Sequence, residues 1–303
     1  MTISKFGFVT LMGAPNAGKS TLLNSFLGEK ISIVCHKRQT TRTRIAGILT
    51  KNETQMVLVD TPGIFFDPKR RLEKSMISAA WQATFEAHII LLIVDVKSPY
   101  LFEDLEKIME KLESVSEKVV LVLNKIDLLK DKSSLLKITE TLTSSFTFKE
   151  VFMISATKKT GLQNLEKLLV SEMPEAPWMY PEDQLSNLPE RFLAAELTRE
   201  VLLHQLHEEV PYGLVVQTEK WEDFKNGDVK IFQMICVERK SHKSIVLGKQ
   251  GAKIKTIGER ARKEISKALG CKVHLFLHVC VDEKWQDKPD FYQDLGLDYK
   301  SDD

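Results

Sequence analysis

The stretch Gly13-Ala14-Pro15-Asn16-Ala17-Gly18-Lys19-Ser20 matches the phosphate-binding pattern G-x-x-x-x-G-K-[ST]. It follows the apolar run 6–12 and precedes residues 21–27, which are typical of the start of a helix. A glycine-rich turn between a strand and a helix lets several backbone N–H groups point at one anion, and the helix N-terminus adds partial positive charge. Lys19 would then reach the β- and γ-phosphates, and the Ser20 hydroxyl would bind Mg²⁺. We therefore expect the chain to bind a nucleoside phosphate.

The composition is that of an ordinary globular protein. The 303 residues are 43% hydrophobic and 28% charged, with a net charge of +1. The four cysteines, at positions 35, 236, 271 and 280, form no C-x-x-C pair, and we expect free thiols without a disulfide or a zinc site. The longest strongly apolar run, 89–94, is too short to cross a bilayer, and the first residues do not resemble a removable signal peptide. We expect a cytoplasmic monomer; peripheral contact with the inner face of the cell membrane stays open.

Residues 5–173 alternate short apolar runs with stretches of helical periodicity. Strands are expected at 6–12, 44–50, 55–60, 88–95, 118–124 and 151–155, and helices at 102–112, 135–146 and 162–170. Several of the apolar runs are nearly continuous, as in strands that are buried on both faces. The pattern predicts an α/β fold, with a doubly wound domain over residues 1–173 and ligands at the carboxyl ends of its strands.

The connection 30–44 begins with an apolar run, 31–35, and then becomes polar and basic. One interpretation is a solvated loop. The other, which we favour once a phosphate site is granted, is a mobile switch whose threonine completes the Mg²⁺ shell only when a γ-phosphate is present. We choose Thr41 as the ligand, and Thr40 is the competing choice.

Asp60-Thr61-Pro62-Gly63 closes the third predicted strand. An aspartate at a strand end can hold Mg²⁺ through water, and a glycine lets its backbone N–H approach the γ-phosphate. A D-x-x-G sequence alone is weak evidence, but its distance after the phosphate loop makes it strong. The predicted metal ligands are therefore Ser20, Thr41 and Asp60.

Asn124-Lys125-Ile126-Asp127, at the end of the fifth predicted strand, indicates which base is bound. Guanine presents two donors, N1–H and the exocyclic amino group, and a buried Asp127 carboxylate could accept both. Adenine would leave that carboxylate unpaired, which costs on the order of 10⁴ in discrimination. Asn124 would bind the other edge of the base, and the Lys125 stem would pack on the ring. Ser155 and Ala156, after the sixth strand, would place a backbone N–H near the guanine carbonyl.

The predicted nucleotide site draws on all of these motifs, and they favour GTP over ATP. Its GTP-binding residues are Gly13, Ala14, Pro15, Asn16, Ala17, Gly18, Lys19, Ser20, Thr21, Asp60, Thr61, Pro62, Gly63, Ile64, Asn124, Lys125, Ile126, Asp127, Ser155 and Ala156.

In these motifs the first half of the chain resembles the translation-factor-like P-loop GTPases, and the Era GTPases in particular: G-x-P-N-x-G-K-S, Q-T-T-R, D-T-P-G, N-K-I-D and I-S-A all match. The resemblance implies GTP hydrolysis with slow intrinsic turnover, since Ile64 stands where Ras-like proteins carry a water-orienting glutamine. It also implies that Asn16 helps to hold K⁺ beside the phosphates. The predicted catalytic residues are Lys19, Thr41, Gly63 and Asn16.

A proline-rich stretch separates the two halves of the chain. Four prolines between 174 and 189 stop helices and give an extended connection, so a linker is expected at 174–190. A second domain, 191–284, follows, with a helix at 191–207, strands at 214–218 and 229–237, a helix that ends near 269 and a strand at 273–282. Residues 285–303 form a C-terminal tail, in which Trp285 and Phe291 are expected to pack on this domain and the last residues to fray.

The second domain carries a basic turn. Eleven Lys or Arg and three Glu lie between 238 and 272. A basic run is often only a solvated helix face, but here it contains G-x-x-G between apolar residues. With the order α-β-β-α-α-β this favours a KH fold, in which the turn clamps the backbone of about four single-stranded nucleotides. The predicted RNA-binding residues are Ile245, Val246, Gly248, Lys249, Gln250, Gly251, Lys253, Ile254 and Lys255.

The second half also resembles Era, in the type II KH sequence V-L-G-K-Q-G-A-K-I-K-T-I-G, so the resemblance covers nearly the whole chain. It implies binding near the 3′ end of small-subunit (16S) rRNA and assistance in assembling the 30S ribosomal subunit. We favour a switch in which GTP orders 30–44 and the segment after Gly63, and thereby changes RNA binding. The alternative is a constitutive RNA-binding assembly chaperone with slow, incidental GTPase activity.

Overall fold

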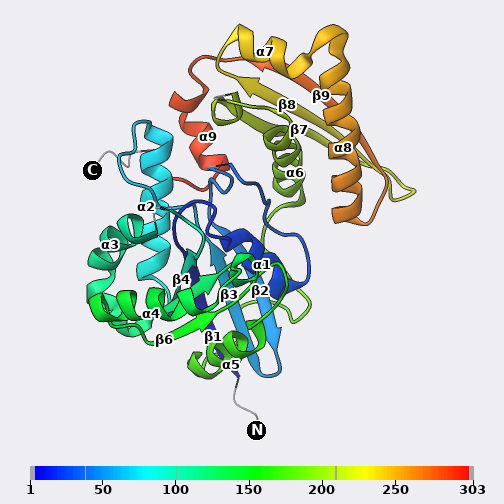
Figure 1. Ribbon diagram of the computed structural model, residues 1–303. Helices are drawn as coiled ribbons and strands as arrows, with labels where there is room; N and C mark the ends of the chain where they lie inside the picture. Colours follow the sequence, from blue (N-terminus) through cyan, green and yellow to red (C-terminus); the bar gives the residue numbers. More distant parts are fainter. Residues whose placement is uncertain (1–3, 38, 100, 209, 300–303) are drawn as a thin grey trace. The chain divides into compact units, whose positions relative to one another are not determined.

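The computed structural model describes residues 4–37, 39–99, 101–208 and 210–299 (Figure 1). The chain divides into two compact units. The first contains Met1–Ser32, Thr41–Asn187 and Leu295–Asp303, and the second contains Ile33–Thr40 and Leu188–Asp294. These boundaries differ from the predicted ones, because residues 33–40 belong to the second unit and most of the predicted linker belongs to the first.

The first unit is built on a six-stranded sheet in the order β2-β3-β1-β4-β5-β6. Its strands are β1 (Lys5–Met12), β2 (Ile45–Lys51), β3 (Thr54–Asp60), β4 (Ile89–Asp95), β5 (Val119–Asn124) and β6 (Glu150–Met153). All neighbours are parallel except β2 and β3. These two are antiparallel because only Asn52 and Glu53 separate them, and a two-residue turn can join only antiparallel strands.

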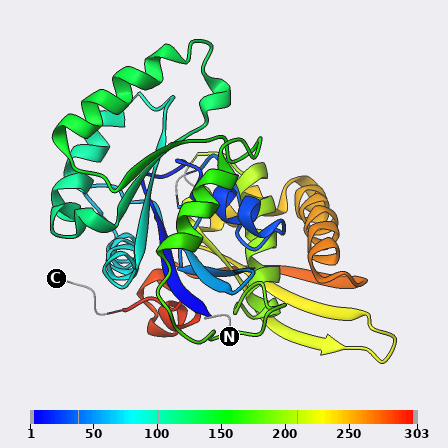
Figure 2. The ribbon, with the colours of Figure 1, turned by 90° about the horizontal axis from the view of Figure 1, so that it is seen from below.

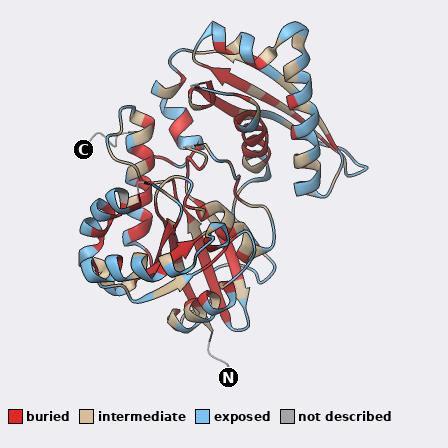
Figure 3. Cartoon of the chain, in the orientation of Figure 1, coloured by how far each residue is buried: buried red, intermediate tan, exposed pale blue. Residues whose placement is uncertain are grey.

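Helices cover both faces of this sheet. They are α1 (Lys19–Leu27), α2 (Arg71–Phe85), α3 (Leu101–Leu112), α4 (Ser133–Ser145) and α5 (Leu162–Glu172), of which α2 is not among the helices that the sequence predicted. One apolar cluster joins α2, α3 and α4 to β4 and β5, and α1 and α5 lie on the opposite face (Figure 2). The central strands are therefore buried on both sides, as their apolar runs predict (Figure 3). None of the described helices is long and apolar enough to cross a membrane.

The proline-rich stretch lies along the edge of the first unit as an extended chain. Ile48 N donates to Leu185 O (2.8 Å). The side chain of Gln55 accepts from the backbone N–H groups of Met179 and Tyr180 and donates to the carbonyl of the latter. An edge strand such as β2 leaves backbone groups without partners in the sheet, and this stretch supplies them. The predicted linker is thus attached to the first unit as far as residue 187.

The second unit has a three-stranded sheet in the order β7-β8-β9, with β7 and β8 antiparallel and β8 and β9 parallel. Its elements are α6 (Glu190–Gln205), β7 (Leu214–Asp223), β8 (Val229–Val237), α7 (Lys240–Leu247), α8 (Ala252–Leu269), β9 (Val273–Val281) and α9 (Pro289–Asp294). From α6 to β9 the order is the predicted α-β-β-α-α-β. Alternate residues of the strands, among them Ile235 and Val237, pack with Leu202 of α6 and Ile257 of α8 to form the core. The predicted fold class is confirmed.

The C-terminal tail divides between the two units. In the second unit Trp285 and Phe291 are buried, with ring centroids 4.6 Å apart, as expected. From Leu295 onward the tail belongs to the first unit, where Ser75 Oγ donates to Asp298 O (2.8 Å). Residues 300–303, which are expected to fray, lie outside the described residues.

Cys236 and Cys280 are joined by a disulfide, so the prediction of free thiols is wrong for this pair and correct for Cys35 and Cys271. The bonded cysteines occupy paired positions on β8 and β9, and their Cα atoms are 4.8 Å apart, within the range that a disulfide needs. Spacing along the chain gives no sign of this pair, because only the register of two parallel strands brings the two residues together.

Candidate functional site

The phosphate loop connects β1 to α1. Gly13, Asn16 and Gly18 have positive φ angles of 147°, 65° and 103°. A Cβ at Gly13 would lie 2.2 Å from Ile93 O, and one at Gly18 would lie 2.3 Å from Asn124 Nδ2. Glycine is therefore required at both positions by close approach as well as by backbone angle. The loop ends at the first N–H groups of α1, which have no partners within the helix and are suited to an anion.

Lys19 is buried beneath the loop. Its Nζ donates to Gly13 O (3.0 Å) and Ala14 O (2.9 Å). Burial lowers the pKa of Lys19 to about 8, and the negative charge of Asp60 opposes this shift. The amine is thus held in position with part of its positive charge suppressed, and a bound polyphosphate would restore that charge.

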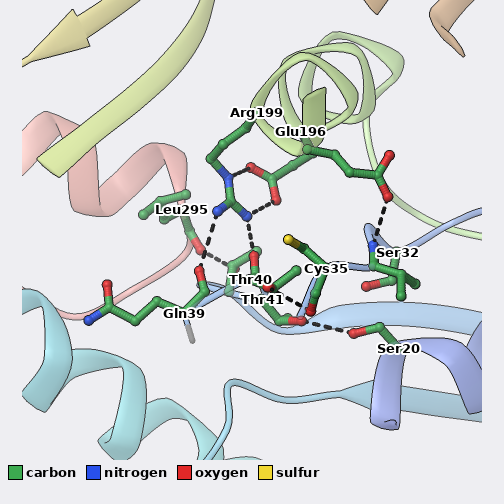
Figure 4. A network of polar contacts seen from close by, with 12 residues as sticks. Ser20, Ser32, Cys35, Gln39, Thr40, Thr41, Glu196, Arg199 and Leu295 are labelled. Carbon is green, nitrogen blue, oxygen red and sulfur yellow. Dashed lines mark hydrogen bonds and ion pairs between the residues drawn. The ribbon is translucent and has the colours of Figure 1, made fainter. Parts of the chain in front are cut away.

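Ser20, Thr41 and Asp60, the three predicted metal ligands, lie together. Ser20 Oγ donates to Asp60 Oδ2 (2.6 Å) and lies 3.0 Å from Thr41 Oγ1. Thr41 Oγ1 is 3.3 Å from the same carboxylate oxygen, and Figure 4 shows how Thr41 and Ser20 face each other. The competing choice, Thr40, instead donates its hydroxyl to Lys37 O (2.7 Å). The fold therefore brings Thr41 to the other two residues and turns Thr40 away.

Asp60 presents an oxygen that its neighbours do not use. Ser32, which the sequence analysis did not select, also donates to Oδ2 (2.8 Å), but the buried Oδ1 has no hydrogen-bond partner among the described residues. Burial raises the pKa of Asp60, while Lys19 and the three hydroxyls lower it. A buried carboxylate oxygen without a partner is costly, and hydroxyl and carboxylate oxygens are the ligands that Mg²⁺ prefers. These residues therefore fit a magnesium ion.

The segment after β3 closes against the phosphate loop through its backbone. A Cβ on Gly63 would lie 2.7 Å from the backbone of Pro15. Ile64 N donates to Gly13 O (3.1 Å), but the Ile64 side chain lies in the apolar core, as does that of Ile126. These two side chains are thus part of the core, because apolar groups are stabilised by burial, and the predicted contact of the two residues with the nucleotide stays a prediction.

Asn124 joins the phosphate loop to the segment after β6. Its side chain is buried, its Nδ2 donates to Ala17 O (2.9 Å), and its Oδ1 accepts from Ala156 N (3.0 Å). Both ends of the amide are thus bonded to the chain. This brace aligns two predicted parts of the nucleotide site, and it is a role that the sequence did not predict.

Two carboxylates lie in the region of the predicted base motif. Lys125 has a positive φ of 68°, and its Nζ is 2.6 Å from Asp95 Oδ2, at the end of β4. Asp95 was missed by the sequence analysis, because no motif includes it; it fixes the stem that is predicted to pack on the base. Asp127 is exposed, whereas a buried carboxylate was expected at this position. Ser155 is buried, and its Oγ accepts from Lys158 N (3.1 Å).

The G-x-x-G turn lies between α7 and α8. Gly248 has a φ of 69°, and a Cβ there would lie 2.6 Å from Lys253 Cβ. Gln250 and Gly251 also have positive φ, at 51° and 77°. The turn is therefore tight, and it leaves no room for a side chain at Gly248.

The side chains around this turn divide into an outer and an inner set. Lys249, Gln250 and Lys255 are exposed, as contacts to a nucleic-acid backbone require. Ile245 is exposed too, but the next residue, Val246, is fully buried in the core of the second unit. The side chain of Val246 is therefore turned away from the surface of the turn, because consecutive helical residues point in different directions, and its predicted contact with RNA stays a prediction.

Two family models match the chain. The model described as "50S ribosome-binding GTPase" matches residues 8–125, and a KH domain model matches residues 209–286. Among curated proteins, the chain is 50% identical over 298 residues to the GTPase Era of Brucella suis biovar 1 (strain 1330), covering 98% of this chain and 95% of that protein. It is 46% identical over 311 residues to the GTPase Era of Maricaulis maris (strain MCS10), covering 98% of each.

Two solved structures are similar over nearly the whole chain. One is a variant of Era from Aquifex aeolicus bound to GDP and AlF₄⁻, with 36% identity, a TM-score of 0.90 and coverage of 96% of this chain and 99% of that one. The other is Era in complex with MgGDPNP and nucleotides 1506–1542 of 16S ribosomal RNA, with 35% identity, a TM-score of 0.90 and coverage of 97% and 99%.

Proposed function

The chain belongs to the Era family of GTPases, and from this we propose that it is a GTP-hydrolysing switch that binds single-stranded 16S rRNA near the 3′ end and assists assembly of the 30S subunit. The observation that carries the proposal is the convergence of Lys19, Ser20, Thr41 and Asp60 beside the phosphate loop, in a chain that also presents an exposed G-x-x-G turn. The relative with bound GDPNP and 16S rRNA supports the choice of RNA.

The groups of the nucleotide site suit phosphoryl transfer to water. The backbone N–H groups of the loop and Lys19 hold the β- and γ-phosphates. Ser20, Thr41 and Asp60 would hold Mg²⁺, which when bound would neutralise part of the phosphate charge. The Ile64 side chain lies in the core and cannot orient a water molecule, so intrinsic turnover is slow.

A second ion is part of the proposal. Asn16 is exposed on the phosphate loop and has a left-handed backbone, and its side chain would help to hold a monovalent cation beside the phosphates. K⁺ bound there would add positive charge where the transition state is most negative. A hydrolysis rate that is the same in potassium and sodium buffers, and the same in the Asn16→Asp variant, would exclude this role.

Thr41→Ala tests the site, with Thr40→Ala as its matched control. We expect Mg²⁺-dependent GTP hydrolysis to fall at least about tenfold in the first variant, because a metal ligand is lost, and to stay within about twofold in the second. Equal losses in both variants would refute the assignment of Thr41.

A second experiment separates the switch from a constitutive chaperone. RNA affinity is measured with GDP and with a non-hydrolysable GTP analogue at fixed salt, and equal affinities would favour the chaperone.

A further inference from the structure

Residues 33–40, part of the predicted switch connection, are built into the second unit. Ile33 is fully buried in a core cluster that includes Ala194 and Leu197 of α6 and Ile231 of β8. Lys37 Nζ donates to two carbonyls at the C-terminal end of α6, those of Leu203 and Leu206. The segment is therefore held by apolar burial at its start and by a cation near its middle.

Two charged side chains of α6 hold the backbone of this segment. Glu200 Oε1 accepts from Val34 N (2.9 Å). Arg199 donates from Nη1 to Gln39 O (3.3 Å) and from Nη2 to Thr40 O (Figure 4). We call Arg199, Glu196 and Glu200 the α6 clasp. It holds the backbone on both sides of Lys37.

Arg199 is 2% exposed, and its guanidinium is bonded to the carboxylate of Glu196 by Nε (2.7 Å) and Nη2 (2.6 Å). A buried ion pair is stable only if its remaining donors are also bonded, and here the carbonyls of Gln39 and Thr40 accept from them. An arginine that merely stabilised α6 would need only its i−3 partner. The bonds to the carbonyls of Gln39 and Thr40 therefore tie the segment 33–40 to α6 through the same guanidinium that pairs with Glu196.

Thr40 is followed directly by Thr41, whose hydroxyl lies 3.0 Å from Ser20 Oγ. On the basis of the proposed function, we propose that Arg199 is a positioning residue that transmits the nucleotide state. Arg199 fixes the carbonyl of Thr40. Movement of Thr41 toward a magnesium ion bound to GTP would therefore make or break the bonds between the α6 clasp and residues 39 and 40. This change would alter RNA binding by the second unit. No sequence motif assigns this role to α6.

The test compares RNA affinities of the full chain in two nucleotide states. The probe is a labelled single-stranded 3′-end fragment of 16S rRNA, and the quantity is the ratio of its Kd with GDP to its Kd with a GTP analogue. We expect a ratio of about 5 to 150 in the wild-type protein, the range typical of coupling between two sites. We expect Arg199→Lys to bring the ratio to within about twofold of one, because an ammonium cannot hold the carboxylate and both carbonyls in one plane.

Arg191→Lys is the matched control. Arg191 lies on the same helix and also donates to two backbone carbonyls, those of Thr218 and Glu219, and among the described residues neither of these bonds reaches the segment 33–40. We expect this variant to keep the wild-type ratio. If Arg199→Lys lowers stability, Lys37→Met, at a partly exposed position, removes the neighbouring attachment without disturbing the buried pair. A wild-type ratio in both Arg199→Lys and Lys37→Met would overturn the proposal, since a purely structural role changes both affinities equally.

Hydrogen exchange of amides 34–40 separates failure of the clasp from failure of the switch. We expect the Val34 amide, bonded to Glu200, to exchange faster in Arg199→Lys and at the wild-type rate in Arg191→Lys. Unchanged exchange in Arg199→Lys would refute the clasp. If the unmodified protein itself binds RNA equally well in both nucleotide states, the proposed switch is refuted whatever the exchange shows, and the role of Arg199 in transmitting the nucleotide state is refuted with it.

Discussion

The lowered pKa of Lys19 predicts that nucleotide affinity depends on pH. The amine is buried and has a pKa of about 8, against 10.5 in the unfolded chain. Because this pKa is lowered, the unfolded chain binds more protons than the folded chain between pH 8 and 10.5. Lys19 therefore makes the free energy of folding about 3 kcal/mol less favourable below pH 8, and this penalty disappears as the pH rises to 10.5. A bound polyphosphate reverses the effect, because it favours the protonated amine.

The magnitude for binding follows from the same pKa. If only the protonated amine binds the β-phosphate, the Kd for GDP is proportional to 1 + 10^(pH − pKa). With a pKa of about 8, this Kd rises about fourfold from pH 7 to pH 8.5. Binding should also take up a proton. The assay is titration with a fluorescent GDP derivative across this pH range, together with calorimetry in two buffers of different ionisation enthalpy.

Lys19→Met provides the reference. Its affinity is lower throughout, and any titration of the guanine base remains in it, so the difference in pH dependence between the two proteins isolates Lys19. The reasoning is refuted if wild-type Kd is flat from pH 7 to 8.5, or if the variant shows the same slope.

Three further predictions follow from the two sites. Gly18→Ala should lower the free energy of unfolding by about 2–4 kcal/mol, because its Cβ would meet Asn124 Nδ2. Gly28→Ala, which has a similar backbone but nothing within 4 Å, should cost only about 1 kcal/mol; equal losses on thermal unfolding would contradict the steric account. Asp127→Asn should weaken GTP binding by about tenfold or more and improve xanthosine triphosphate relative to GTP in a competition assay, and unchanged preference would show that this carboxylate does not read the base. Lys255→Ala should weaken RNA binding and reduce the slope of log affinity against log salt by about one unit; a lower affinity with an unchanged slope would argue against a phosphate contact.

Much of the fold could be predicted, because the relevant signals are local. The continuous apolar runs of β4 and β5 predict strands buried on both faces, and the structure covers them with helices on both sides. Helix α2 was missed although its buried residues recur on one face, among them Leu72, Met76 and Ala80. These residues are spaced four apart, which is the period of one helix face, so the sequence does contain a signal for this helix.

The side-chain roles were predicted less completely. Ile64, Ile126 and Val246 stand within binding motifs, yet their side chains lie in cores. A motif specifies which residues are near a ligand along the chain, but the direction of each side chain depends on the local turn of helix or strand. The reverse holds for Ser32 and Asp95: no motif contains these residues, yet the fold brings their side chains to the site.

The sequence by itself determined the phosphate loop, the D-T-P-G and N-K-I-D motifs, the basic G-x-x-G turn and the order α-β-β-α-α-β in the second unit. Each of these depends on a few consecutive residues whose chemistry needs no distant partner. Only the tertiary structure decided that residues 33–40 belong with α6, that Cys236 pairs with Cys280 and that Thr41, not Thr40, faces Ser20. These depend on contacts between residues far apart in sequence. Burial and strand register select those contacts only when the whole chain is folded.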